Sequence, residues 1–321
     1  RMRTIKLIKN RSDIGAGTRG ADMGIDAIEI AAINKEDDFF NCYSYEDIDT
    51  ENETIYNKVF NSFAKRIKSV SRVCSRLSSS VKQNLLDNNF PIVLSGDHSS
   101  ALGTISGIKA AYPEKELGVI WIDAHADLHT PYTSPSGNIH GMPLAAALND
   151  DNLDYQINEV IDDTELYWNQ MKNIGIDGPK IKHESIVYFG VRDVEEPEAE
   201  AIKNNEIKNY TVAEIRYRGM EKCLNEAIQK LNHCDHIYIS FDVDSMDCDL
   251  ISKGTGTPVS KGFDQDEIKE IINKVIESGK VACVEVVEVN PCLDNKGNVM
   301  AETAFDVLSD FTKTIEQVNI K

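Results

Sequence analysis

The stretch Leu117-Gly-Val-Ile-Trp-Ile122, followed directly by Asp123-Ala-His-Ala-Asp127, decides the fold class of this chain. Its almost uninterrupted apolar run predicts a strand buried on both faces, as in a parallel sheet covered by helices. Acidic and imidazole side chains stand where that strand would end. Ligands bind outside the carboxyl ends of parallel strands, because the loops converge there while the helices return below. The stretch therefore predicts an α/β sheet with a site at one edge.

Similar apolar runs alternate with helical patterns along the chain, which favours one α/β domain over residues 1–321 with a mostly parallel sheet. Residues 34–54 are acidic and aromatic without a clear period, and an irregular surface segment is expected there. Besides 117–122, the expected strands are 90–94, 185–189, 237–241 and 281–287. The expected helices are 56–87, 101–111, 141–148, 264–278 and one from about 303.

Composition limits the class of function. The 321 residues carry a formal net charge of −19, which argues against a nucleic-acid partner and is compatible with a cationic substrate. No apolar stretch approaches the roughly 18 to 20 residues that cross a bilayer, so no membrane partner is expected. With no evident signal peptide, and seven cysteines but no Cys-x-x-Cys pair, reduced thiols and a cytoplasmic location are expected.

Acidic or imidazole residues follow four of the expected strands. A single Asp after a strand is usually a helix or turn cap. Four such strand ends that meet at one sheet edge favour a metal site instead. The junctions are Ser95-Gly-Asp-His-Ser99, Asp123-Ala-His-Ala-Asp127, Asp242-Val-Asp244 and Glu288-Val-Asn-Pro291.

Six side chains in these junctions are candidate metal ligands. Residues two apart in an extended segment point to the same side, so each D-x-H-x-D or D-x-D unit can face one centre. Two divalent cations would balance four carboxylates. Carboxylates with two imidazoles and no thiolate favour Mn²⁺, then Fe²⁺, Co²⁺ or Ni²⁺, over zinc. The candidates are His98, Asp123, His125, Asp127, Asp242 and Asp244.

Two further histidines, His129 and His140, lie in the same part of the chain but fit no ligand spacing. Imidazole titrates near neutral pH, so each is a candidate for proton transfer or substrate contact, with a structural role as the alternative.

Taken in order, these segments resemble the ureohydrolases. Ser136-Gly-Asn-Ile-His-Gly-Met-Pro143 and Gly254-Thr-Gly-Thr-Pro258 add to the likeness, and the first of them points to arginases within that group. The resemblance covers nearly the whole chain and is weakest over residues 34–54 and 150–182. It implies a three-layer α/β/α fold, two Mn²⁺ per subunit and a homo-oligomer, either a trimer or a hexamer. The implied reaction is hydrolysis of L-arginine to L-ornithine and urea.

The resemblance also implies which residues bind each metal ion and how the reaction begins. A hydroxide bridging the two ions would attack the guanidinium carbon, and Asp123 and Asp242 would each bridge the pair. One ion would take His98, Asp123, Asp127 and Asp242, and the other would take Asp123, His125, Asp242 and Asp244.

Three residues are implied to be catalytic. Asp127 would orient the hydroxide and pass a proton to the departing amine, Glu288 would pair with the guanidinium nitrogens, and His140 would shuttle protons. Two substrate positions depart from the common pattern, because His129 stands where many arginases have Asn and Glu195 where many have Asp. The implied substrate contacts are His129, Ser136, Asn138, Asp193, Glu195, Glu198 and Thr257.

Two alternatives remain open. A sister ureohydrolase would act on agmatine, guanidinobutyrate or formiminoglutamate, and the Ser136-Gly-Asn138 segment argues against it because it suits a substrate carboxylate. A non-catalytic metal-binding or subunit-interaction protein with this fold is the other, and the complete set of ligands together with Glu288 argues against it.

Overall fold

A single sheet of eight parallel strands forms the centre of the chain. The computed structural model describes residues 2–320. Its strands lie in the order β2-β1-β3-β8-β7-β4-β5-β6, and every neighbouring pair is parallel. The strands are β1 (Thr4–Asn10), β2 (Ser44–Asp47), β3 (Asn89–Ser95), β4 (Leu117–Ile122), β5 (Ile186–Phe189), β6 (Lys208–Tyr210), β7 (His236–Asp242) and β8 (Val281–Val287).

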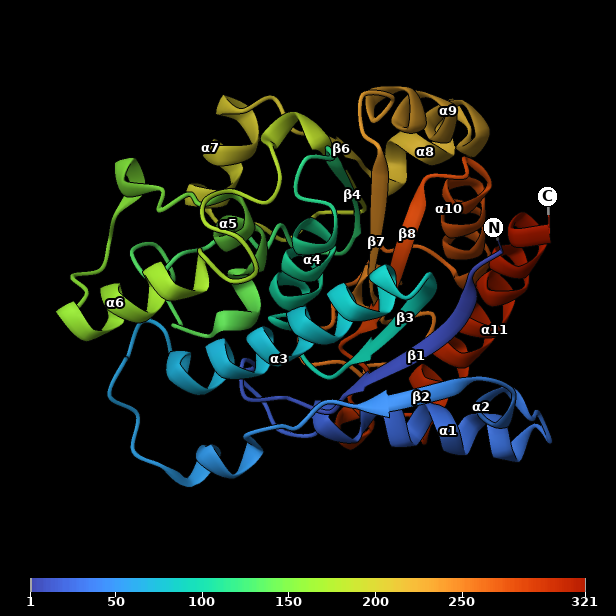
Figure 1. The fold of residues 1–321 in the computed structure, drawn as a ribbon, viewed down its shortest axis with the longest axis horizontal. Coiled ribbons are helices and arrows are strands. Elements are labelled where there is room, and N and C mark those ends of the chain that lie inside the picture. The colour runs from blue at the N-terminus through green and yellow to red at the C-terminus, as the bar shows by residue number, and fades with distance from the viewer. Residues whose placement is uncertain (1, 321) are drawn as a thin grey trace.

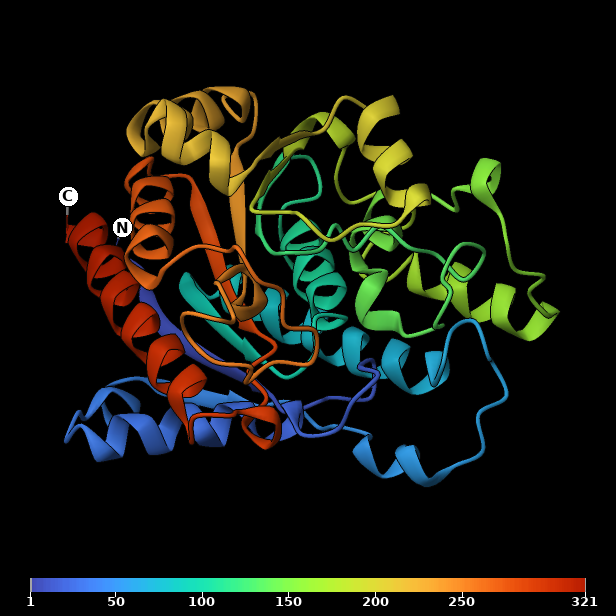
Figure 2. The same ribbon diagram turned by 180° about the vertical axis from the view of Figure 1, so that it is seen from behind.

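Helices cover both faces of the sheet, which confirms the three-layer α/β/α prediction. In Figure 1 α3, α4 and α5 lie in front of the sheet, and Figure 2 shows α10 and α11 on the opposite face. None of the helices within residues 2–320 is long and apolar enough to span a membrane. The helices are α1 (Gly24–Asn34), α2 (Phe39–Cys42), α3 (Ile67–Leu86), α4 (Ser100–Ala111), α5 (Pro143–Leu148), α6 (Asp162–Met171), α7 (Glu196–Asn204), α8 (Val212–Arg218), α9 (Met220–Lys230), α10 (Gln265–Glu277) and α11 (Val299–Ile320).

Strand β4 shows why a continuous apolar run forms a central strand. Val119 and Trp121 pack into the apolar cluster beneath α3 and α4, whereas Ile120 and Ile122 pack into the cluster beneath α10 and α11. Alternate side chains of a strand point to opposite faces, so a strand covered on both sides needs apolar residues at every position.

The helix expected over residues 56–87 begins eleven residues later than predicted, at Ile67. Arg66 adopts a left-handed conformation with φ of 59°, which does not continue a helix, and the Lys65 N–H donates to Gly137 O at 2.8 Å. The apolar residues Val59 and Phe60, which suggested the helix, are 37% and 72% exposed. A contact with a distant loop therefore overrides the local helical period.

The expectation of an irregular segment over residues 34–54 is also wrong. This segment contains α2 and the edge strand β2, which pairs in parallel with β1. Phe39 is buried and its ring lies 5.8 Å from that of Phe305, so the segment is held by a residue near the other end of the chain.

Strands β3, β8, β7 and β4 are consecutive in the sheet. Because all four run in the same direction, their carboxyl ends lie next to one another at one edge. These are the strands that the acidic and imidazole residues follow, so strand order brings the four junctions together.

Candidate active site

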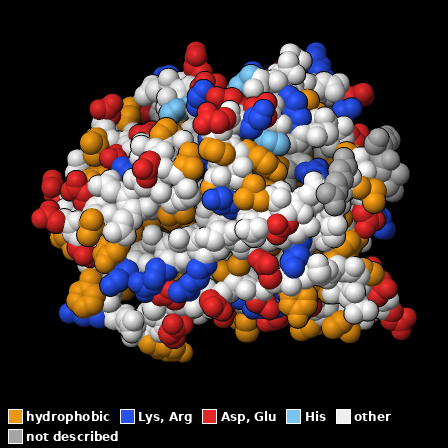
Figure 3. All heavy atoms as spheres, in the orientation of Figure 1, with side chains coloured by type: hydrophobic (Ala, Val, Ile, Leu, Met, Phe, Trp, Pro, Cys, Tyr) orange, Lys and Arg blue, Asp and Glu red, His pale blue; other side chains and the backbone are white. Residues whose placement is uncertain are grey.

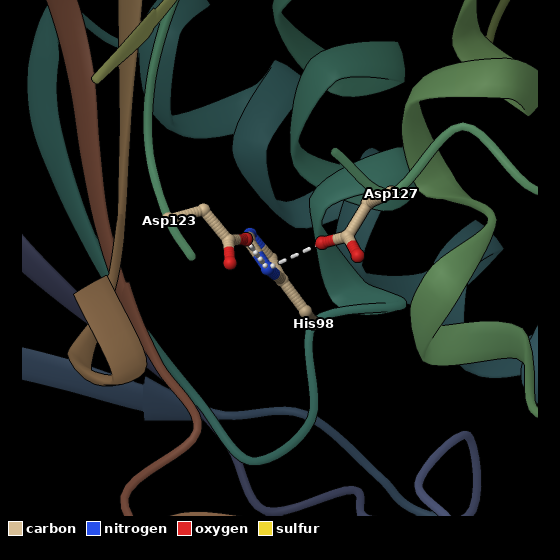
Figure 4. Close-up of side chains that lie close together, drawn as sticks. All are labelled: His98, Asp123 and Asp127. Carbon is tan, nitrogen blue, oxygen red and sulfur yellow. Dashed lines mark ion pairs between the residues drawn. The ribbon is translucent and has the colours of Figure 1, made fainter. Parts of the chain in front are cut away.

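A first group of candidate ligands surrounds the imidazole of His98, which follows β3. Its Nδ1 lies 3.0 Å from Asp123 Oδ2, 3.0 Å from Asp127 Oδ2 and 3.2 Å from Asp242 Oδ2. Figure 4 shows Asp123 and Asp127 approaching this imidazole from two sides. All four residues are buried.

A second group lies beside the first and shares Asp123 with it. His125 Nδ1 lies 2.9 Å from Asp244 Oδ2 and 3.5 Å from Asp123 Oδ1. Asp123 thus presents Oδ2 to the first group and Oδ1 to the second, which is the arrangement of a bridging carboxylate. Asp242 approaches His98 through Oδ2, but within residues 2–320 it forms no ion pair with His125, so the bridging role of Asp242 stays a prediction.

The chemistry of these groups fits divalent cations. His98 Nδ1 and Asp123 Oδ2 are buried but make no hydrogen bond, although they lie 3.0 Å apart. A spacing of about 3 Å matches neighbouring ligand atoms on an octahedral ion with bonds of about 2.1 Å. Burial and the neighbouring Asp123 raise the pKa of Asp127 to about 8. Buried carboxylates crowded in this way need positive charge between them, and two divalent ions would provide it.

Sequence reasoning missed Ser240, which orients His98. Ser240 Oγ lies 2.6 Å from His98 Nε2, and the His98 ring stacks on Trp121 at 4.1 Å. When Nε2–H donates to Ser240, Nδ1 presents a lone pair to the carboxylate group, as a metal-binding imidazole requires. A signal was present in the sequence, because Ser240 lies two residues before Asp242 on the same strand and therefore faces the same side.

Two buried carboxyl groups beneath the site were also missed. Asp97 Oδ2 accepts the Gly15 N–H at 3.1 Å, and burial together with nearby Glu288 raises the pKa of Asp97 to about 6. Glu285 accepts hydrogen bonds from the Ser95, Ser100 and Tyr238 hydroxyls at 2.6–2.8 Å. These contacts tie the loop after β3 to β7 and β8.

The three residues predicted to be catalytic lie next to these groups. Glu288 Oε1 accepts the His98 N–H at 2.9 Å, and its Oε2 lies 3.8 Å from His140 Nδ1. Burial opposes a charge on His140, but Glu288 and Asp127 raise the pKa of His140 above its ordinary value. Asp127 and Glu288 have positive φ of 50° and 76°. Such strained backbone in non-glycine residues is concentrated at functional sites.

A cavity of about 310 Å³ opens over the metal-ligand groups. At its base Thr257 Oγ1 donates to Asp244 Oδ2 at 3.1 Å, while Asp193 Oδ2 lies 3.2 Å from His125 Nε2. Asp193 is thus placed to orient His125 and also lines the cavity, so its predicted substrate contact stays a prediction. All seven predicted substrate contacts line the cavity, namely His129, Ser136, Asn138, Asp193, Glu195, Glu198 and Thr257.

Negative charge gathers on one wall of this cavity. His129 Nε2 lies 3.2 Å from Glu195 Oε1 and 3.3 Å from Glu198 Oε1. Burial opposes a charge on His129, but the Glu198 and Glu195 carboxylates raise the pKa of His129. Glu198 also accepts the Glu195 and Leu128 N–H groups, so it holds the start of α7 in place as well. The wall suits a cationic group.

Comparison with known proteins places this site in a family. The profile of the Arginase family matches residues 4–313. The arginase of Bacillus subtilis (strain 168) is 37% identical over 308 residues, which is 95% of this chain and 96% of that protein. The solved structure of the arginase of Bacillus caldovelox has a TM-score of 0.82 at 34% identity and covers 96% of this chain and 98% of that one.

A more distant structure, the formimidoylglutamase of Bacillus subtilis, shares the fold with a TM-score of 0.74 at 20% identity, covering 98% of this chain and 88% of that one. The fold, the buried groups of His and Asp and these likenesses define a hydrolase that acts on an amidino group. The chain belongs to the arginase family.

Proposed function

We propose that this protein hydrolyses L-arginine to L-ornithine and urea at two divalent cations. One observation carries the proposal. A single cavity has the proposed metal ligands at its base and, on its walls, groups suited to an α-amino group and an α-carboxylate. A substrate with a guanidinium at one end and α-amino and α-carboxylate groups at the other matches that arrangement.

The proposed ligands are the six residues predicted from the sequence, with Asp123 spanning both ions. When bound, two divalent cations would lower the pKa of a coordinated water toward 7 and so make a nucleophile available at neutral pH. Carboxylates and imidazoles without thiolates favour Mn²⁺, with Co²⁺, Fe²⁺ and Ni²⁺ as other candidates.

Asp127, Glu288 and His140 act on the substrate in this proposal. Asp127 orients the attacking water, takes its proton and delivers the proton to the departing amine as the C–N bond breaks. Glu288 presents a buried carboxylate to the guanidinium nitrogens, a directional and charge-assisted contact. His140, 3.8 Å from Glu288, carries protons between this site and the open cavity.

The other end of the substrate would lie along the cavity walls. Ser136 and Asn138 bind the α-carboxylate, and the acidic wall formed by Glu195 and Glu198 receives the α-ammonium group. His129 takes part in this wall through its 3.2 and 3.3 Å approaches to the two carboxylates. Asp193 and Thr257 hold His125 and Asp244 from the side of the cavity.

Urea release tests the proposal directly. The protein is loaded with Mn²⁺, Co²⁺, Fe²⁺, Ni²⁺ or Zn²⁺ and assayed with L-arginine and with agmatine, which lacks the carboxylate. We expect L-arginine to be the better substrate and Mn²⁺ the better metal. Faster turnover of agmatine would assign the protein to a sister activity, and no urea with any metal would contradict the proposed catalysis.

The resemblance also supports a cytoplasmic homo-oligomer, a trimer or hexamer, as part of the proposal. Size-exclusion chromatography with light scattering measures the mass of the protein in solution. A monomer would contradict the proposed oligomer without affecting the proposed arginine hydrolysis.

A further inference from the structure

A basic surface lies outside the active site of this acidic protein. Residues 54–86 include seven Lys and Arg residues and no Asp or Glu, although the chain as a whole carries −19. In Figure 3 blue side chains gather at the lower left, over the N-terminal half of α3 and the segment before it. Nothing in the proposed reaction uses this surface.

The surface is hollowed by a cavity of about 420 Å³, named here the basic cavity. Lys58, Arg66, Lys68 and Arg72 line it, and Asp163 is the one carboxylate in the lining. The Asp163 carboxylate already accepts the amide N–H of a neighbouring residue of the lining, Asn61, at 3.0 Å.

Within the part of the chain that the structure describes, three of the four cations in the basic cavity have no acidic partner. Within residues 2–320, Lys58, Arg66 and Lys68 form no ion pair, whereas Arg72 Nε lies 2.8 Å from Glu51 Oε2. Like charges around one cavity repel one another, and the repulsion is relieved when an anion enters. The cavity therefore has the electrostatics of an anion site.

The other residues that line the basic cavity indicate which class of anion it would bind. Ser69 and Asn57 offer hydrogen-bond donors, and Tyr167 and Phe60 offer aromatic faces. Guanidinium and ammonium groups together are typical of phosphate recognition. The volume exceeds that of one phosphate group, so an organic group can lie against the rings.

We propose that the basic cavity binds a small phosphorylated anion. The phosphate group lies between Arg66, Lys68 and Lys58, and any ring attached to it lies beside Tyr167. Free phosphate and a nucleoside phosphate share this chemistry, and separate titrations distinguish them.

The cavity is connected to the active site through the Lys65 backbone and the Arg66 side chain. Lys65 N–H donates to Gly137 O at 2.8 Å, between Ser136 and Asn138 of the substrate pocket. Arg66 Nε–H donates to Ile14 O at 3.0 Å, and the next carbonyl, Gly15 O, accepts the His140 N–H at 2.9 Å. An anion that holds Arg66 in place would therefore also hold its neighbour Lys65, which bonds to the loop at Gly137. It would likewise hold the backbone at Ile14, which precedes the carbonyl that accepts the His140 N–H. This coupling, unlike the binding itself, rests on the proposed arginase activity.

Calorimetric titration of the metal-loaded protein with inorganic phosphate, and separately with adenosine monophosphate, tests the binding. Metal content is measured after each titration to exclude loss of metal to the phosphate. We expect one site per chain and at least tenfold weaker binding in Lys68→Glu. Lys82→Glu, the same charge change on α3 outside the cavity lining, is the matched control and retains binding.

Tighter binding of adenosine monophosphate would identify a nucleoside phosphate as the ligand class, and equal affinity would identify phosphate itself. No saturable binding of either anion, or equal weakening in Lys68→Glu and Lys82→Glu, would overturn the site. Circular dichroism of both variants shows whether each retains the fold.

The coupling is tested by urea release at saturating anion. We expect KM for L-arginine, kcat or both to change at least twofold, and Lys68→Glu to remove the change. Binding without any effect on KM or kcat would overturn the coupling alone. Absence of all arginine hydrolysis would contradict the proposed function but leave the binding result intact.

Discussion

At the scale of single residues, the candidate site depends on where individual atoms point. Asp123 serves two ligand groups because its two oxygens face opposite neighbours, His98 and His125. Asp127 reaches only the first group, through Oδ2, 3.0 Å from His98 Nδ1. Substitutions that keep shape but change one atom therefore separate the roles of these residues.

Asp127→Asn tests the proton-transfer role. The amide keeps the side-chain volume and one oxygen but cannot carry a proton to the leaving amine. We expect kcat to fall by about 100-fold or more, the usual size of a lost general acid–base group. Steady-state urea release measures this, with metal content determined in parallel. Near-normal kcat with both metals bound would refute the role.

Ser240→Ala tests the orientation of His98. The 2.6 Å contact from Ser240 Oγ to His98 Nε2 is lost, and the imidazole loses the partner that fixes its ligand nitrogen. Loss of such an outer partner lowers metal affinity by about 10- to 100-fold. Competition with a chelator of known affinity measures the change. Ser79→Ala, at an exposed position of α3, is the control, and unchanged affinity in Ser240→Ala would show that Trp121 stacking suffices.

At the scale of elements, the loop over residues 134–138 lies in a tightly packed part of the cavity wall that is proposed to bind the substrate. Gly137 has φ of 73°, and a Cβ there would lie 2.1 Å from Ser62 O. The close approach lets Lys65 N–H bond to Gly137 O and fixes Ser136 and Asn138 on either side. The same contact explains why residues 57–66 leave the helix that their apolar spacing suggested.

Gly137→Ala therefore strains the backbone and also displaces the loop. We expect KM for L-arginine to rise several-fold with a smaller change in kcat, because the substitution moves the predicted carboxylate contacts and leaves the metal ligands in place. Gly178→Ala is the matched control, since Gly178 has a similar φ of 81° but nothing within 4 Å of its Cβ. Strain alone destabilises by about 1 kcal/mol or more in both variants. Equal KM values in the two variants would contradict the importance of the close approach.

At the scale of the whole molecule, the buried carboxylates link metal binding to stability. Four carboxylates from the ends of β4 and β7 meet beside two imidazoles. Burial with mutual repulsion raises the pKa of Asp127 to about 8 and that of Asp242 well above its ordinary value. Cations between them would remove this repulsion, so the fold and the metals should stabilise each other.

Removal of metal is expected to lower Tm, by about 5 °C or more, because ligands that bind only the folded state stabilise it. The loss should grow with pH. A raised carboxyl pKa means that the metal-free folded state holds more protons than the unfolded state between about pH 4 and pH 8, so the free energy of unfolding falls as pH rises across that range. Calorimetry at pH 5 and pH 8, with and without chelator, measures both effects. A metal-free Tm that rises toward pH 8 would contradict this account.

Much of the fold and of the site could be predicted because the signals are local. Strands 117–122 and 281–287 match the prediction residue for residue, since each is buried on both faces and so is apolar at almost every position, with Glu285 the exception. The six candidate ligands come together because each follows a strand end. Glu285 and Asp97 were missed because a lone acidic residue has no distinctive pattern until its partner is known. Ser240 was missed although its position two residues before Asp242 on the same strand was a usable signal.

By itself, the sequence determined the alternation of buried strands with helices and the acidic and imidazole residues that end four of the strands. These features could be predicted because the spacing of apolar residues within a short stretch indicates both its burial and its backbone conformation. Only the tertiary structure decided that β3, β8, β7 and β4 lie side by side, that β2 closes the edge, and that Lys65 bonds to the loop at Gly137. Pairing between strands and contacts between distant loops depend on the shape of the whole chain. For that reason His98 and Glu288, 190 residues apart, share a hydrogen bond that no local pattern specifies.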